Sequence, residues 1–382
     1  MRISLHSPIF DGKEIQFTNN CIKTSWLSSS GKFVKLFEDK VKSFTKSKFA
    51  IACVNGTAAL QISLRLAGVN NNHEVIVPTI TFIAPINAVR YNGANPIFMD
   101  CDEYCNIDVK KTIEFINKET FFKKQFTYNK KTKNKISAII VVHVFGNPVN
   151  LEPLIKICKK RNIKIIEDGS ESLGSKYISG KLKNKHTGTV GYLGCLSFNL
   201  NKIVTSGGGG MILTNNKKIA KKAKYLTNQA KDDSINFVHN SIGYNFGLTN
   251  IHAAIGYAQL SKLNKVLLQK KKIFLQYKKN LNSNKNLRLI SNPKYSQSNH
   301  WLNLVQLIKQ KNKKNKLIKK FSMKKIEVRP IWRCNHLQKP YLNYQKYKIT
   351  KAPKMVSNCL CLPSSYFLKT DKIKKISNLL KK

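Results

Sequence analysis

Short apolar runs separated by helical segments are the feature of this 382-residue chain that most limits its fold. The runs lie at 50–54, 74–77, 96–99, 137–142, 163–166, 195–198 and 210–214. Amphipathic segments such as 58–66 and 151–160 lie between them. This alternation is typical of a mostly parallel sheet covered by helices on both faces. We therefore predict an α/β fold built on a mostly parallel seven-stranded sheet.

The pattern changes around Thr249, after which helical stripes dominate. A strand-like run at 301–308 and a proline-punctuated stretch at 329–363 follow, and a last apolar stripe ends the chain at 373–380. We predict a large domain over 1–261 and a smaller α+β domain over 262–382. The lysine-rich segment 122–135 lacks apolar periodicity and is predicted to be a solvated insertion.

The charge is strongly positive, because 68 Lys and Arg residues face 19 Asp and Glu residues, a formal net charge of +49. Such a balance usually suggests nucleic acid or a membrane surface as partner. Nucleic-acid sites combine Arg with aromatic residues, however, and nearly all of this basic set is Lys. Lys, Asn and Ile all have A/T-rich codons, so genome composition is the preferred explanation. A basic nucleic-acid-binding protein on an inactive enzyme scaffold is the alternative from another class.

Location and metal content follow from what the sequence lacks. No run approaches the roughly 18 to 20 apolar residues of a membrane helix, and the first residues form no apolar signal segment. The nine cysteines show no paired Cys-x-x-Cys spacing. We expect a cytoplasmic protein with reduced thiols, no metal site, and neither nucleic acid nor membrane as partner.

Three motifs carry candidate chemistry. Residues 54–60 follow a strand and open a helix, whose N-terminus could bind phosphate with help from Thr57, although a plain capped turn explains the motif as well. Asp168 ends a buried strand, where it could hold a proton on a ring nitrogen or cap a helix. Lys202 precedes a four-glycine turn at 207–210 and could form a Schiff base, or be one more surface lysine.

Taken in order, these motifs resemble the DegT/StrS sugar aminotransferases, which are pyridoxal 5'-phosphate (PLP) enzymes of fold type I. The matching runs are 55–60 (NGTAAL), 77–84 (VPTITFIA), 143–149 (HVFGNPV), 166–174 (IEDGSESLG), 197–210 (SFNLNKIVTSGGGG) and 242–250 (IGYNFGLTN). Related dehydratases replace the lysine with histidine, so Lys202 indicates an aminotransferase.

The resemblance implies a role for each matching position. Lys202 would bind PLP covalently and shuttle protons, and Asp168 would pair with the pyridinium nitrogen. Phe82 would stack on the ring. Thr57, Ala58 and Ser197 would bind the phosphate, with Asn245 reaching it from the second subunit of a homodimer. The remaining implied positions are Glu171 and Asn199 near the cofactor, and His336 and Arg329 near the substrate.

The runs at 24–29, 201–211, 229–233, 329–332 and 336–338 are most similar to the branch that serves legionaminic acid and bacillosamine synthesis. That branch implies transfer of an amino group, from an amino acid such as glutamate, to C4 of a nucleotide-linked 4-keto-6-deoxy-N-acetylhexosamine. A perosamine-type or 3-amino sugar is the alternative within the family. The predicted partners are thus a nucleotide sugar, an amino-acid donor and a second copy of the chain.

Overall fold

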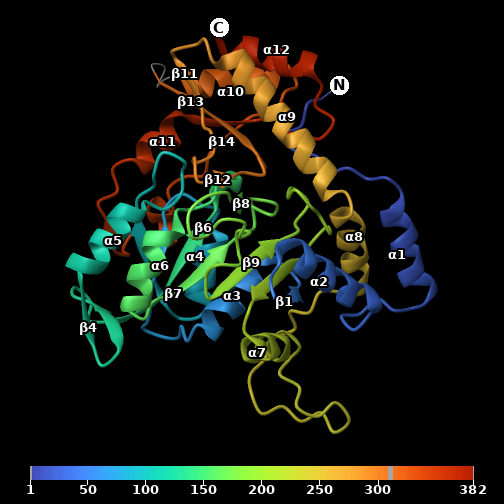
Figure 1. The fold of residues 1–382 in the computed structure, drawn as a ribbon, viewed down its shortest axis with the longest axis vertical. Coiled ribbons are helices and arrows are strands. Elements are labelled where there is room, and N and C mark those ends of the chain that lie inside the picture. Colours follow the sequence, from blue (N-terminus) through green and yellow to red (C-terminus); the bar gives the residue numbers. More distant parts are fainter. Residues whose placement is uncertain (1, 309–312, 382) are drawn as a thin grey trace.

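A twisted sheet forms the centre of the computed structural model, which describes residues 2–308 and 313–381 (Figure 1). All seven predicted strands are present, in the spatial order β1 (Phe49–Cys53), β10 (Gly210–Thr214), β9 (Leu193–Ser197), β7 (Lys164–Asp168), β6 (Lys135–Val142), β2 (Glu74–Pro78) and β3 (Asn95–Met99). Only β10 runs antiparallel to its neighbours in this series. The predicted α/β fold with a mostly parallel sheet is confirmed.

Three further strands widen the sheet to ten. β15 (Lys346–Tyr347) adds a parallel edge to β3, and β4 (Thr120–Lys123) forms a hairpin with β5 (Phe126–Asn129), which also pairs with β6. Most side chains of 122–135 are exposed, as expected for a solvated insertion, but the ordered hairpin within this segment was not predicted. Cross-strand stacking of Phe121 on Tyr128, with ring centroids 5.5 Å apart, stabilises this hairpin despite its lysines.

Each face of the sheet is covered by its own helices, because strand side chains alternate between the two faces. In β2, Val75 and Val77 join the core beneath α2 (Lys32–Thr45), α3 (Gly56–Leu66) and α7 (Lys217–Thr227), whereas Ile76 joins the core beneath α5 (Val109–Lys118) and α6 (Leu151–Lys160). The other helices of this part are α1 (Lys13–Lys23), α4 (Ala84–Tyr91), the short η1 (Val144–Gly146) and α8 (Asn250–Leu260).

The C-terminal part has a third apolar core beside an antiparallel sheet. The sheet order is β11 (Leu287–Leu289), β13 (Asn303–Leu307), β16 (Cys359–Leu362) and β14 (Arg329–Pro330). Around it lie α9 (Leu263–Leu281), α10 (Lys314–Met323), α11 (Ala352–Asn358) and α12 (Thr370–Lys381), at the top of Figure 1. The division at residue 262 stays a prediction.

Two short strands join this C-terminal part to the large one. β12 (Ser296–Gln297) pairs with β8 (Lys176–Tyr177), and β15 pairs with β3, following the short helices η3 (Asn335–Leu337) and η4 (Lys339–Tyr341). Within residues 2–308 and 313–381, no helix combines the length and the apolar character needed to cross a bilayer. All nine cysteines are buried and free of disulfides.

Candidate active site

The predicted site residues gather where parallel strands end. β7 ends at Asp168 and its neighbour β9 ends at Ser197, while the turn after β1 leads into α3. Ligands of open α/β sheets bind outside these carboxyl ends. A cavity of about 510 Å³ lies here, and its walls include eight predicted residues: Thr57, Phe82, Asp168, Glu171, Ser197, Asn199, Lys202 and Arg329.

The N-terminus of α3 forms one end of this cavity. The Asn55 side chain caps the helix by accepting a hydrogen bond of 2.8 Å from the Ala58 N–H. Gly56 packs so closely on β9 that an added Cβ would lie 2.9 Å from Ser197 Cβ. Thr57 and Ser197 therefore lie together at a positive helix end that suits a phosphate group. Ala58 is not in the cavity wall, and its amide already has Asn55 as a partner.

The last two residues of the four-glycine turn let it lie next to this helix end, because a Cβ on Gly209 or Gly210 would collide with neighbouring atoms. A Cβ on Gly210 would lie 2.3 Å from the Asn55 carbonyl oxygen, a distance that no real Cβ shows. Gly207 has a φ of 78° and Gly209 one of 143°, both in the region that favours glycine. Gly209 also lines the cavity. The glycines thus bring the backbone of the turn up to the phosphate end of the site.

Asp168 contributes a buried carboxylate to the cavity wall. Its Oδ1 accepts a 2.9 Å hydrogen bond from the Ser170 N–H. Residues 169–174 form turns, so the helix-capping alternative considered for Asp168 does not apply. A buried carboxylate beside a ligand cavity can hold a proton on a basic ring nitrogen, because the pair of charges is then shielded from water.

Lys202 lies on the turn between β9 and the glycines. Its Nζ lies 4.6 Å from the centre of the Trp301 ring, and its backbone N–H donates to the Asn199 carbonyl oxygen at 3.0 Å. An aromatic face attracts the ammonium form without donating or accepting a strong hydrogen bond. The amine therefore stays available at the cavity wall for reaction with a carbonyl group.

Glu171 adds an ionisable group that changes charge near neutral pH. Burial raises the pKa of its carboxyl group to about 7, against the opposing effect of the Lys202 charge. The Phe145 N–H donates to its Oε2 at 2.7 Å, which fixes the carboxyl group in place. Glu171 thus places an ionisable carboxyl group in the wall of the same cavity as Lys202.

Phe82 offers an exposed aromatic face at the same cavity. The side chain follows β2 and is 57% exposed, although most large apolar side chains of the sheet are buried. A flat aromatic ligand would cover this face by stacking. A ring platform, a carboxylate, a lysine amine and a phosphate-binding turn thus surround one space, and these residues fit PLP.

Two other predicted residues do not reach the cavity. His336 is buried, and its Nδ1 lies 2.6 Å from Thr79 Oγ1. Burial lowers the pKa of its ring. Asn245 is exposed, and the backbone bridge at this residue joins it to Asn228. The substrate role of His336 and the cross-subunit role of Asn245 stay predictions.

An aromatic wall of the cavity was not predicted from the sequence. Trp301 and Trp332 line the cavity and also an adjoining one of about 300 Å³, which Arg329 shares. Trp332 stacks on Phe145 at a centroid distance of 4.7 Å and an interplanar angle of 5°. Tryptophan is the rarest aromatic residue here, with three in the chain, and that rarity was a usable signal.

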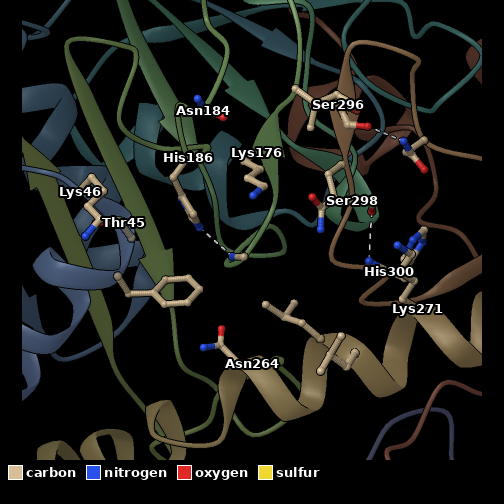
Figure 2. Close-up of a pocket in the computed structure, with 17 residues that line it drawn as sticks. Thr45, Lys46, Lys176, Asn184, His186, Asn264, Lys271, Ser296, Ser298 and His300 are labelled. Atoms are coloured by element: carbon tan, nitrogen blue, oxygen red, sulfur yellow. Dashed lines mark hydrogen bonds between the residues drawn. The ribbon is translucent and has the colours of Figure 1, made fainter.

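A larger cavity of about 760 Å³ lies beside α9 and contains none of the predicted residues (Figure 2). His186 and His300 lie in its wall with Lys46, Lys176 and Lys271. Both nitrogens of His186 are already used: Nε2 accepts from the Gly174 N–H at 2.7 Å, and Nδ1 lies 2.5 Å from the Thr187 carbonyl oxygen. This cavity is large and positively charged, but the ring nitrogens of its His186 already have hydrogen-bond partners.

Comparison with known proteins identifies the family of this chain. A profile for the DegT/DnrJ/EryC1/StrS aminotransferase family matches residues 8–381. The chain is 35% identical over 353 residues to a GDP-perosamine synthase of Escherichia coli O157:H7, covering 91% of this chain and 90% of the relative. It is 32% identical over 345 residues to a GDP-perosamine synthase of Caulobacter vibrioides, covering 89% and 87%.

The fold is also similar to that of the PLP form of Spr1654 from Streptococcus pneumoniae, described as a putative sugar aminotransferase. The TM-score is 0.87 at 20% identity, over 100% of this chain and 98% of that one. The predicted family, enzyme class and cofactor are thereby confirmed. The chain belongs to the DegT/DnrJ/EryC1/StrS aminotransferase family and is a PLP-dependent sugar aminotransferase.

Proposed function

We propose that this enzyme moves an amino group from an amino acid, with glutamate as the expected donor, to C4 of a keto-sugar carried by a nucleotide. The observation that carries the proposal is the meeting of Lys202, Asp168 and the phosphate-binding turn at one cavity. The likeness to sugar aminotransferases supports a sugar as the acceptor. The product would serve the synthesis of surface polysaccharides or of nonulosonic acids.

Each residue of the site has a proposed role in the reaction. PLP, when bound, supplies an electron sink for the carbanion that forms when an amino acid loses its α-proton. Lys202 holds the cofactor and moves the proton at the α-carbon, and Asp168 keeps a proton on the ring nitrogen. Thr57 and Ser197 bind the phosphate, while Phe82 supports the ring. The donor product leaves before the keto-sugar enters, so the kinetics are expected to be ping-pong.

Two sugars remain candidates for the acceptor. The names of the E. coli and C. vibrioides relatives favour a GDP-linked sugar of the perosamine type. The motif similarities described above favour a keto-sugar that bears an N-acetyl group. We propose the perosamine type as the first to test, because both named relatives cover most of the chain.

A panel of GDP-, UDP- and dTDP-linked 4-keto-6-deoxy sugars, with and without an N-acetyl group, tests the acceptor. Mass spectrometry and NMR of the product would identify the sugar and the aminated carbon. Preferred turnover of the GDP-linked sugar without the N-acetyl group supports the first candidate. Amination at C3 would overturn the proposed C4 chemistry, and no turnover with any keto-sugar would overturn the proposed function.

A second copy of the chain is proposed to complete each site. The segment that carries Asn245 extends beyond α7, at the end of the molecule away from the C-terminal part (Figure 1). Its side chains Ile235, Phe237 and Ile242 are 84%, 71% and 76% exposed. Exposed apolar side chains that lie together usually mark an interaction surface. We expect a homodimer in which this segment packs on the partner subunit.

Sedimentation across a salt series, with PLP occupancy read in parallel, tests this assembly. Each chain carries +49, and a Debye length of about 8 Å at physiological salt limits the repulsion to charges near the interface. The dimer should therefore tolerate moderate salt and weaken as ionic strength falls. Phe237→Ser should weaken it further. An active monomer with full PLP occupancy would contradict the cross-subunit role of Asn245.

A further inference from the structure

Lys270 is a fully buried lysine on α9, outside the cavity that holds Lys202. Its amine donates to the carbonyl oxygens of Trp301, at 2.9 Å, and of Ser364, and lies 2.9 Å from Nδ1 of His6. None of these partners is a carboxylate. Burial lowers the pKa of this amine, and its hydrogen bonds replace the hydration that it loses on burial.

One branch of this hydrogen-bond network reaches Lys202 through His6. Nδ1 of His6 accepts from the Lys270 amine, because the other nitrogen of the neutral ring faces a carbonyl oxygen, which can only accept, and must therefore carry the hydrogen. That nitrogen, Nε2, donates to the Lys202 carbonyl oxygen at 3.0 Å. Burial lowers the pKa of His6, which keeps the ring neutral and able to accept at Nδ1.

The second branch reaches the preceding residue through Trp301. The Trp301 carbonyl oxygen accepts from Lys270, and its ring Nε1–H donates to the Asn201 carbonyl oxygen at 2.8 Å. The face of the same ring lies 4.6 Å from the Lys202 amine. Two consecutive carbonyl groups of the Lys202 turn are therefore tied to one amine on α9, by two routes.

We propose that Lys270, through His6 and Trp301, is the positioning residue that holds the Lys202 turn and so places the reactive amine against the cofactor. The turn lies outside any helix or strand, so it relies on such bonds for its position. Sites of this kind need placement within about 0.5 Å, and a displacement of about 1 Å can cost roughly 100-fold in rate. The inference rests on the proposed attachment of PLP to Lys202.

The test replaces Lys270 by methionine, which has similar length and no donor. PLP is added to cofactor-free protein, and the rate of covalent attachment is followed by absorbance, by borohydride reduction and by peptide mapping. We expect Lys270→Met to slow attachment and to lower kcat about tenfold to 100-fold, with KM for the sugar within about twofold. Lys272→Met, exposed on the same helix, is the matched control and should match the parent.

His6→Phe is the second variant, since it removes both ring nitrogens but leaves Lys270 in place. His6→Phe should also slow the covalent attachment of PLP. It replaces Lys270→Met as the test if Lys270→Met does not fold. The inference would be overturned if a folded Lys270→Met protein attached PLP and turned over at the rates of the parent. If Lys270→Met does not fold, parent rates in His6→Phe would overturn it. Parent protein that borohydride labels on a lysine other than Lys202 would instead overturn the proposed attachment site.

Discussion

The two cavities beside the central sheet differ in the state of their polar groups. The larger cavity beside α9 (Figure 2) has two histidines that are already engaged. His186 is hydrogen-bonded at both ring nitrogens, and the His300 ring stacks on Phe274 with ring centroids 4.2 Å apart. The smaller cavity presents the Lys202 amine over an aromatic ring, the exposed Phe82 face and a carboxyl group with a raised pKa. Volume alone therefore does not distinguish the candidate active site from the other cavity.

The two cavities also differ in the pKa values of the ionisable side chains in their walls. Burial lowers the pKa of His186 to about 4, so this ring stays neutral and inert at physiological pH. Burial raises the pKa of Glu171 to about 7, so that side chain can exchange a proton there. Groups that exchange protons in catalysis need pKa values near the working pH, and Glu171 in the smaller cavity has such a value.

The strongest test of this comparison removes one lysine from each cavity. Lys202→Ala should lower turnover by at least about 10³-fold, because no other group there can hold the cofactor covalently and move the proton. Lys271→Ala, in the larger cavity, should stay within about twofold of the parent. Steady-state kinetics with a keto-sugar measure both. A large loss for Lys271→Ala would show that the larger cavity also takes part.

Asp168→Asn should have the next largest effect. The amide keeps the shape of the side chain and can still accept from the Ser170 N–H, but it no longer provides the charge that holds a proton on the ring nitrogen. We expect a loss of about 100-fold in kcat with unchanged urea stability. Stopped-flow absorbance of the half-reaction with glutamate isolates the step. Parent-like rates would remove Asp168 from the mechanism.

The sequence predicted the fold well wherever a pattern repeats within one segment. The alternation in β2, with Ile76 on one face and Val75 and Val77 on the other, is visible as an apolar run, and so are the other six main strands. The turn between β4 and β5 was missed because Lys124 and Gln125 adopt positive φ values without glycine or asparagine. Two-residue strands such as β15 are too short to carry a pattern.

The sequence predicted those parts of the site whose positions are determined by the ends of the strands. Asp168 and Ser197 could be placed together because parallel strands end at one edge. Trp301 and His6 could not, because their approach to Lys202 depends on how the C-terminal part and the first residues pack against the sheet. Phe145 reaches Trp332 from a backbone with a φ of 54°, which no local propensity indicates.

His186→Ala should affect stability rather than turnover. The variant leaves the Gly174 N–H and the Thr187 carbonyl without their ring partner, which should cost about 2 to 4 kcal/mol of unfolding free energy. Urea unfolding measures this cost, and kcat/KM of the folded fraction should stay within about twofold. Lost activity with unchanged stability would assign catalysis to the larger cavity and reverse the comparison.

The pH dependence of stability gives the smallest and most specific test, because Glu171 and His186 have shifts of opposite sign. The pKa of Glu171 is higher in the folded than in the unfolded chain, so the folded state binds more protons between about pH 4.5 and 7, and its contribution to stability is lost as pH rises through this window. The pKa of His186 is lower in the folded chain, so its contribution to stability is lost as pH falls from about 6.5 to 4.

Glu171→Gln keeps an acceptor for the Phe145 N–H. Its free energy of unfolding should exceed that of the parent by about 1 to 2 kcal/mol at pH 8, with little difference at pH 4.5. Urea unfolding of the cofactor-free proteins at both pH values measures this, and an equal difference at the two would show that Glu171 does not titrate between them.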